Sequence, residues 1–292
     1  MYPEGIAYDK GNRRILLSSL VSNAMVSLDP ANGMALQTTY TPELDNASGL
    51  GIKVDERTGQ VHVAIGTFSA FDNGGFVVYD LPVSDSATAT AAVTLNPLLM
   101  PCTDGTASCG LAADVAIAGG VTYVTDSMIG RLFKVENGVM EEVTSDPLLM
   151  WLDASFPFGS NGLIHDERGF IVLGNTGAAS LVRVDLATNE VMNIPIEGEI
   201  GNVDSILKDS KGRMFVITGT TVYVLRDNRD EWRSAVLMGT IDIDKSADGE
   251  SATTATFGET EKEIYITYVR FNDLFGAGTN NDPALIGKIT VF

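Results

Sequence analysis

Short apolar segments separated by turn residues recur along the chain. In the clearest copy, a segment that begins at Asn161 leads to a turn over Asp166–Gly169, then to the apolar run Phe170–Leu173 and, after small residues, to Ala179–Asp185. Apolar runs of this length between Asp- and Gly-containing turns predict β-strands. The runs are continuous rather than alternating, so both faces of these strands are expected to be largely buried.

The same arrangement occurs six times, and each copy begins with the segment expected to be its inner strand. The opening residues are Glu4, Leu50, Asp114, Asn161, Asp204 and Thr254. Most intervals between them are roughly 40–50 residues, a period typical of propeller blades built from several short strands. The sequence therefore predicts an all-β, six-bladed β-propeller, with residues 1–292 forming a single domain.

A longer interval precedes the third repeat. It is explained by Leu81–Gly110, which is rich in Ala, Ser and Thr and is expected to be an inserted loop. Both cysteines of the chain, Cys102 and Cys109, lie within it. A small disulfide ring between them would imply an oxidising compartment and therefore a secreted or exported protein, whereas two reduced loop thiols are the alternative.

The charge balance bears on possible partners. The chain has 38 acidic and 19 basic residues, a formal charge of −19. Such a chain repels nucleic acid and anionic membrane surfaces, so neither is an expected partner. No apolar run is long enough to predict a membrane span, and Met1–Glu4 does not resemble a signal peptide.

Familiar catalytic signatures are missing from the sequence. It contains no G-x-S-x-G, H-E-x-x-H, Walker or G-x-G-x-x-G pattern. The only two histidines, His62 and His165, each lie in a predicted strand. We interpret them as structural residues, with a catalytic base as the alternative.

Four of the six repeat-opening residues carry side-chain oxygens. They are Glu4, Asp114, Asn161 and Asp204. Equivalent positions of successive inner strands converge on the axis of a propeller, and carboxylates with a carboxamide suit a hard cation such as calcium. The alternative is that polar residues line any solvated channel.

The repeats resemble the SMP-30/gluconolactonase-like family of six-bladed propellers, which is related to paraoxonases and strictosidine synthase-like proteins. The best-matched pieces are Tyr2-Pro-Glu4-Gly, Ser160-Asn161-Gly-Leu and Val203-Asp204. The resemblance implies a divalent metal, often calcium, held by Glu4, Asn161 and Asp204. It also implies that Asp204 is the general base in lactone hydrolysis.

Two positions depart from the family pattern. Where the family usually has an Asn-Asp pair in the third blade, this chain has Ala113-Asp114, so Asp114 is either a ligand or a neighbour of the metal. Ser205 replaces the Gly that usually follows the Asp of the fifth blade. This second departure concerns the substrate side of the site more than the metal.

These observations predict a metal-dependent hydrolase of small lactones or esters, in which the cation polarises the carbonyl. Aromatic residues in loops at the metal end are expected to form the substrate pocket: Phe68, Phe71, Trp151, Phe156, Phe158, Phe271 and Phe275. Such a rim favours a hydrophobic substrate over a sugar lactone, although the same aromatics could simply cover blade edges. A non-catalytic propeller that binds a small ligand or protein, with a structural metal, is the alternative function.

The ends of the chain give a further expectation. Met1 lies three residues before the first inner strand, and Ile286–Phe292 resembles the third strand of the last blade. The sequence therefore predicts a three-stranded sixth blade, together with a natural precursor that supplies an additional N-terminal segment.

Overall fold

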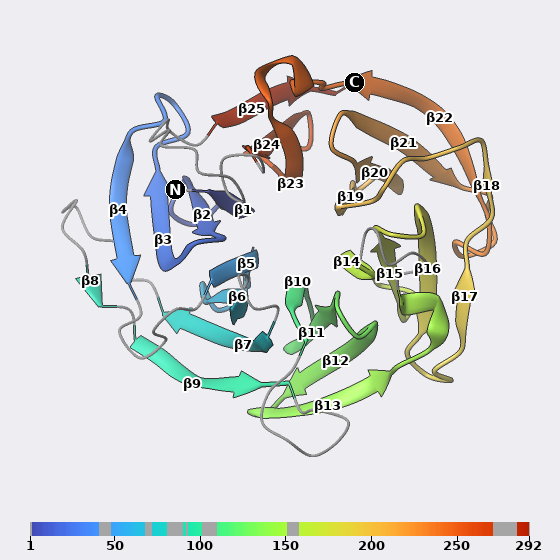
Figure 1. Ribbon diagram of the computed structural model, residues 1–292, viewed down its shortest axis with the longest axis horizontal. Helices are drawn as coiled ribbons and strands as arrows, with labels where there is room; N and C mark the ends of the chain where they lie inside the picture. Colours follow the sequence, from blue (N-terminus) through green and yellow to red (C-terminus); the bar gives the residue numbers. More distant parts are fainter. Residues whose placement is uncertain are drawn as a thin grey trace.

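Six β-sheets surround a central axis, and the strands of each sheet follow one another outward from that axis (Figure 1). The computed structural model describes residues 2–40, 48–67, 72–80, 90–91, 93–100, 110–150, 158–270 and 285–291. The arrangement confirms the prediction of an all-β, six-bladed β-propeller.

The first three blades follow the chain in order. Blade 1 contains β1 (Pro3–Asp9), β2 (Arg14–Ser19), β3 (Ser22–Leu28) and β4 (Ala35–Tyr40), and β8 (Thr90–Ala91) pairs in parallel with β4. Blade 2 contains β5 (Ser48–Val54), β6 (Val61–Thr67), β7 (Asp72–Asp80) and β9 (Val93–Leu99). Blade 3 contains β10 (Ala112–Ala118), β11 (Val121–Asp126), β12 (Arg131–Glu136) and β13 (Val139–Thr144).

The remaining blades complete the ring. Blade 4 contains β14 (Ser160–Asp166), β15 (Phe170–Asn175), β16 (Ser180–Asp185) and β17 (Val191–Asn193). Blade 5 contains β19 (Ser205–Lys208), β20 (Arg213–Ile217), β21 (Thr221–Asp227) and β22 (Ala235–Asp242), with β18 (Ile196–Glu197) parallel to β22. Blade 6 contains β23 (Ser251–Phe257), β24 (Glu263–Val269) and β25 (Leu285–Thr290). Two 3₁₀ turns, η1 (Pro147–Leu149) and η2 (Ser246–Asp248), lie in connections.

Within the described ranges blade 6 has three strands, in agreement with the strand pattern of the sequence. The additional N-terminal segment stays a prediction. In the same ranges, no helix is both long and apolar enough to span a bilayer.

The expectation that Leu81–Gly110 is an inserted loop is wrong in part. Within it, β9 is the outer strand of blade 2 and pairs with β7, while β8 extends blade 1. Pro97 lies in β9 where the register with β7 shifts, between the pairs of Phe76 and Val78. Proline is tolerated there because an edge strand at an irregularity needs no ladder hydrogen bond from that residue.

The core lies between neighbouring blades. Phe170 of blade 4, for example, is fully buried in one cluster with Met214 and Val216 of blade 5. Each such side chain contributes roughly 1.5–3 kcal/mol when removed from water. Packing of blade on blade therefore holds the ring together and fixes the inner strands around the channel.

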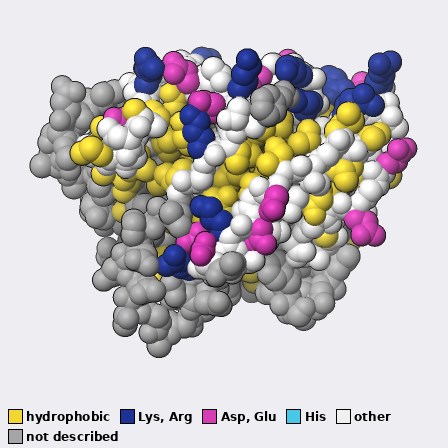
Figure 2. All heavy atoms as spheres, turned by 90° about the horizontal axis from the view of Figure 1, so that it is seen from above, with side chains coloured by type: hydrophobic (Ala, Val, Ile, Leu, Met, Phe, Trp, Pro, Cys, Tyr) yellow, Lys and Arg dark blue, Asp and Glu magenta, His cyan; other side chains and the backbone are white. Residues whose placement is uncertain are grey.

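The outer surface is not uniform in charge. Figure 2 shows Lys and Arg side chains gathered along one rim of the molecule, with apolar side chains exposed below that rim. Positively charged side chains are therefore concentrated along this rim, although the chain as a whole carries a net negative charge.

An irregularity recurs at the opening of the inner strands. In blades 1, 2, 3, 4 and 6, two residues of the inner strand lie opposite one residue of the second strand, as in a β-bulge. The bulged pairs are Glu4-Gly5, Leu50-Gly51, Ala113-Asp114, Asn161-Gly162 and Thr253-Thr254. In blade 5, Asp204 immediately precedes β19 and donates its backbone N–H to Ile217 O at 2.9 Å. A β-bulge changes the direction of the side chains beside it, and these bulges lie at the channel.

Hydroxyl groups opposite the bulges replace the lost ladder bonds. Ser18 Oγ accepts the Gly5 N–H at 2.9 Å and donates to Leu50 O of the next blade. Likewise, Thr125 Oγ1 accepts the Asp114 N–H at 3.1 Å and donates to Asn161 O at 2.8 Å. Each of these hydroxyl groups thus accepts a backbone N–H of the bulge and donates to a carbonyl oxygen of the neighbouring blade.

We expect Thr125→Val to lower the free energy of unfolding by about 1–3 kcal/mol, because the isosteric valine leaves a buried amide and a carbonyl unpaired. Urea unfolding measures the effect. Thr240→Val, at an exposed position of β22, is the control and should change stability by less than about 0.5 kcal/mol. Equal stability of the two variants would show that the bridging hydroxyl contributes nothing.

We expect Asp166, at the hairpin turn of blade 4, to make the stability of the fold sensitive to acid. Burial alone would raise its pKa, but hydrogen bonds from Arg168 and Lys208 outweigh burial and hold the pKa well below its ordinary value. Because the pKa of Asp166 is lower in the folded protein than in the unfolded chain, its ionised side chain stabilises the fold at pH values above the ordinary carboxyl pKa. This stabilisation is lost as the pH falls through the pKa of Asp166 in the folded protein. We expect Asp166→Asn to flatten the loss of stability between about pH 5 and pH 2, measured by urea unfolding. An unchanged pH profile would contradict this role.

Candidate functional site

The oxygen-bearing residues at the strand openings surround one small cavity on the channel axis. It has a volume of about 10 Å³, room for roughly one water molecule. Its lining residues come from all six blades: Glu4, Gly51, Ala113, Asp114, Asn161, Asp204, Ser205 and Thr254. The repeat pattern of the sequence therefore located the place where these side chains meet.

The bulges show which residues of successive inner strands occupy equivalent positions, a point that the sequence left open for Asp114. Glu4, Leu50, Ala113, Asn161 and Thr253 are the first residues of their bulged pairs, and Asp114 is a second residue. Asp114 thus corresponds to Gly5, Gly51 and Gly162 rather than to Glu4 and Asn161. The alignment of Asp114 and Thr254 with the other opening residues was wrong by one position.

Close packing explains why glycine is needed beside Asp114. A Cβ on Gly51 would lie 2.3 Å from Asp114 Oδ1 and 2.4 Å from Asp114 Cα. The Asp114 side chain accepts hydrogen bonds from the backbone N–H groups of Val115 at 2.8 Å and Leu163 at 3.3 Å, one on each oxygen. Lys53 Nζ lies 3.7 Å from Oδ1. These contacts make Asp114 a bridge between inner strands that also borders the cavity.

Asp204 and Asn161 are in direct contact. Asn161 Nδ2 donates to Asp204 Oδ1 at 2.6 Å. Burial raises the pKa of Asp204 to about 7, the Asn161 hydrogen bond opposes the rise, and the Asp114 carboxylate adds to it. Asp204 is therefore a carboxyl group whose proton is held or released near neutral pH.

Glu4 is the least satisfied member of the group. Its Oε2 is buried and, within the described part of the chain, has no hydrogen-bond partner. Burial, followed by the charges of Asp204 and Asp114, raises its pKa well above the ordinary value. A buried carboxylate oxygen without a hydrogen-bond partner is costly, so Glu4 Oε2 is a candidate ligand for a cation.

The chemistry of the cavity fits a hard divalent cation. Three carboxyl groups and one carboxamide meet there, without thiolate or imidazole, and the free Glu4 oxygen is available. Among the residues that the structure describes, however, no three His, Cys, Asp or Glu side chains are already spaced to hold a metal ion. The donor types therefore match calcium, and the ligand arrangement itself stays a prediction.

Two hydroxyl groups at the cavity were not among the predicted site residues. Thr254 Oγ1 donates to Ser205 Oγ at 3.2 Å, and both residues line the cavity. Ser205 was noted only as a departure from the family pattern. Thr254 was recognised as an opening residue, which was the available signal, but not as a site residue.

Most of the predicted aromatic rim falls outside the described residues. This applies to Phe68, Phe71, Trp151, Phe156, Phe271 and Phe275, and also to Cys102 and Cys109 with their proposed disulfide. Phe158 is described: it is half-buried and packs against the core of blades 2 and 3. That placement agrees with the alternative in which an aromatic residue covers a blade.

The two histidines lie away from this cavity. His62 is buried, with Nδ1 2.8 Å from Thr122 Oγ1, and the ring of His165 stacks on Tyr123. Burial lowers the pKa of both side chains. Neither lines the cavity around Glu4 and Asp204, as expected for structural residues.

Comparison with known proteins supports the fold. No protein-family model and no curated protein sequence matches the chain. Among solved structures, the major allergen Mala s 1 of Malassezia sympodialis has a TM-score of 0.69 at 13% identity, covering 99% of this chain and 92% of its own. A luciferin-regenerating enzyme has a TM-score of 0.65 at 12% identity, with 99% and 91% covered.

A gluconolactonase from Xanthomonas campestris is also similar, with a TM-score of 0.64 at 16% identity over 92% of this chain and 84% of its own. At such low identities the similarity shows a shared propeller fold. It does not by itself assign this chain to the family that its motifs resemble.

Proposed function

We propose that this protein hydrolyses small lactones or esters with the help of a divalent cation, preferably calcium, held by Glu4, Asn161 and Asp204. The observation that carries the proposal is the buried Glu4 Oε2, which has no hydrogen-bond partner among the described residues and lies beside Asp204 at the channel axis. The fold similarity to a gluconolactonase and a luciferin-regenerating enzyme supports an enzymatic role for a propeller of this shape.

A bound cation would supply Lewis-acid chemistry by polarising the carbonyl oxygen of the substrate. The chain's own residues have separate roles. Asp204 accepts a proton from the attacking water, and Asn161 orients Asp204 through the 2.6 Å hydrogen bond. Asp114, tied to the amides of Val115 and Leu163, fixes the neighbouring strands. The hydroxyl groups of Ser205 and Thr254 offer hydrogen bonds to water at the cavity.

Turnover of a panel of aryl esters and lactones, with calcium and with chelator, tests the proposal. We expect hydrolysis of at least one small hydrophobic member that stops on chelation and returns with calcium. Turnover that persists in chelator would contradict the metal-dependent mechanism. Absence of turnover across the whole panel would instead favour a propeller that binds a ligand without converting it.

A further inference from the structure

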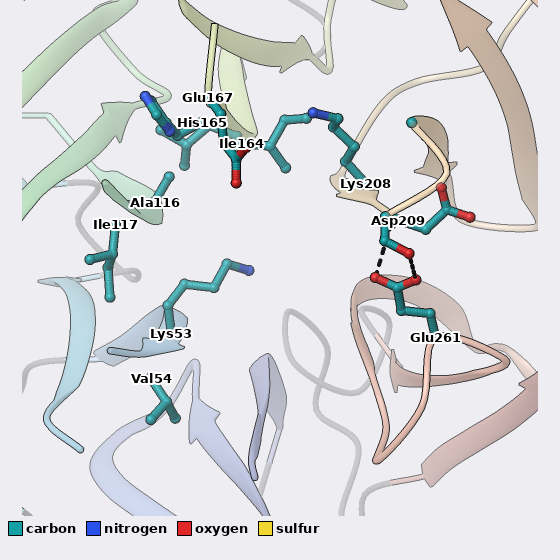
Figure 3. A pocket seen from close by; sticks show the side chains of 13 residues that line it. Lys53, Val54, Ala116, Ile117, Ile164, His165, Glu167, Lys208, Asp209 and Glu261 are labelled. Atoms are coloured by element: carbon teal, nitrogen blue, oxygen red, sulfur yellow. Dashed lines mark hydrogen bonds between the residues drawn. The ribbon is translucent and has the colours of Figure 1, made fainter. Parts of the chain in front are cut away.

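Lys53, in β5, lies between two cavities of the channel. In Figure 3 its side chain extends from the inner strand of blade 2 into a cavity of about 730 Å³, which it lines. Its Nζ lies 3.7 Å from Oδ1 of Asp114, which lines the small cavity together with Glu4 and Asp204. Lys53 thus approaches the proposed cation site from the opposite end of the channel, where the hairpin turns lie.

The small cavity has an excess of acidic groups. Glu4, Asp114 and Asp204 line it, and its described lining residues include no Lys or Arg. Among the described residues, the pair of Asp114 with Lys53 is the one ion pair that any of these three carboxyl groups makes. Burial raises the pKa of Asp114, and the charge of Lys53 is the largest of the effects that oppose the rise. Lys53 is therefore the positive charge that acts most directly on this group.

The two members of the ion pair differ in their surroundings. The side chain of Asp114 is 6% exposed, and the backbone N–H groups of Val115 and Leu163 hold its two oxygens in place. The side chain of Lys53 is 24% exposed, and it faces the larger cavity. The ammonium group therefore keeps part of its hydration while it offsets the charge of a buried carboxylate.

A divalent cation would balance the charges that remain. Three ionised carboxyl groups and one ammonium group leave the small cavity with two negative charges in excess. A bound calcium ion cancels these two charges, and a neutral group of charges costs least to bury.

We propose that Lys53 sets the calcium affinity of the site by acting as the fixed counter-ion of Asp114. The lysine cancels the one carboxylate that is not a proposed ligand, and Glu4 and Asp204 then match the two charges of calcium. This inference rests on the proposed cation site and names a residue that controls it from outside the ligand set.

Calcium affinities of single and double variants test this role, measured by isothermal titration calorimetry of chelator-treated protein at about pH 8, where protons compete little for the carboxylates. Asp114→Asn should weaken calcium binding at least about tenfold, because it leaves the charge of Lys53 near the cation without its counter-charge. Adding Lys53→Met to this variant should restore most of the affinity. Lys53→Met alone should bind calcium at least about tenfold more tightly than the parent.

Lys10→Met and Glu56→Gln are the matched controls, because they make the same changes of net charge at an exposed ion pair. Both should bind calcium like the parent protein. If the parent does not bind calcium, the proposed cation site fails and this inference fails with it. If the parent binds calcium but Lys53→Met does not rescue Asp114→Asn, only the role of Lys53 is overturned. Should Asp114→Asn fail to fold, equal calcium affinity of Lys53→Met and Lys10→Met would overturn that role.

Discussion

Replacing Asp204 by Asn is expected to lower the rate of lactone or ester hydrolysis by about 10²–10⁴-fold, the usual contribution of a positioned general base. Asparagine keeps the size of the side chain but can neither accept the proton nor offer a charged ligand. Stability should not fall, because burial already raises the pKa of Asp204 to about 7 and the fold tolerates a neutral side chain there.

Rates with saturating substrate and calcium, together with thermal unfolding, separate the two effects. Asp244→Asn is the matched control, because Asp244 is exposed in the connection that precedes β23. The control should keep full activity. If Asp204→Asn also turned over substrate at the parent rate, Asp204 would have no role as base.

Asp126→Ala should produce the largest loss of stability, about 3–5 kcal/mol, because it breaks a buried ion pair. Arg131 donates to Asp126 Oδ2 through Nε at 2.9 Å and Nη2 at 2.7 Å, and both residues are at most 1% exposed. Asp126 Oδ1 also accepts the backbone N–H groups of Leu111, Met128 and Ile129. The substitution removes the counter-charge of a buried guanidinium and the acceptor of three amides.

Urea unfolding measures this difference, with Glu259→Ala as the comparison. Glu259 pairs with Arg13 at the surface, where both side chains are more than half exposed. Water screens such a pair, so its loss should cost less than about 1 kcal/mol. Similar losses in the two variants would mean that burial of the Asp126–Arg131 pair adds nothing to its contribution.

The sequence predicted the ring and the meeting point of Glu4, Asn161 and Asp204, because the repeat period places equivalent residues at the channel axis. It misplaced Asp114, since a bulge adds one residue to the inner strand and the turns used for alignment do not record it. It also missed β9, whose Ala/Ser/Thr-rich surroundings suggested a loop. The pairing of Lys53 with Asp114 joins two blades, and no local pattern reveals such a contact.

The pairing of charges between blades could not have been predicted from the sequence. Lys53 and Asp114 lie far apart in the chain, as do Lys208 and Asp166, and both pairs form only in the fold. Topology was therefore predictable from local pattern, whereas charge pairing across blades was not.

Calcium titration of chelator-treated protein by isothermal calorimetry is the most direct test of the cation site at Glu4, Asn161 and Asp204. The proposed site predicts saturable binding at one site per chain, which Glu4→Gln and Asp204→Asn each weaken strongly and the exposed control Asp244→Asn leaves unchanged. Absence of saturable binding, or equal binding by the parent and both site variants, would contradict it.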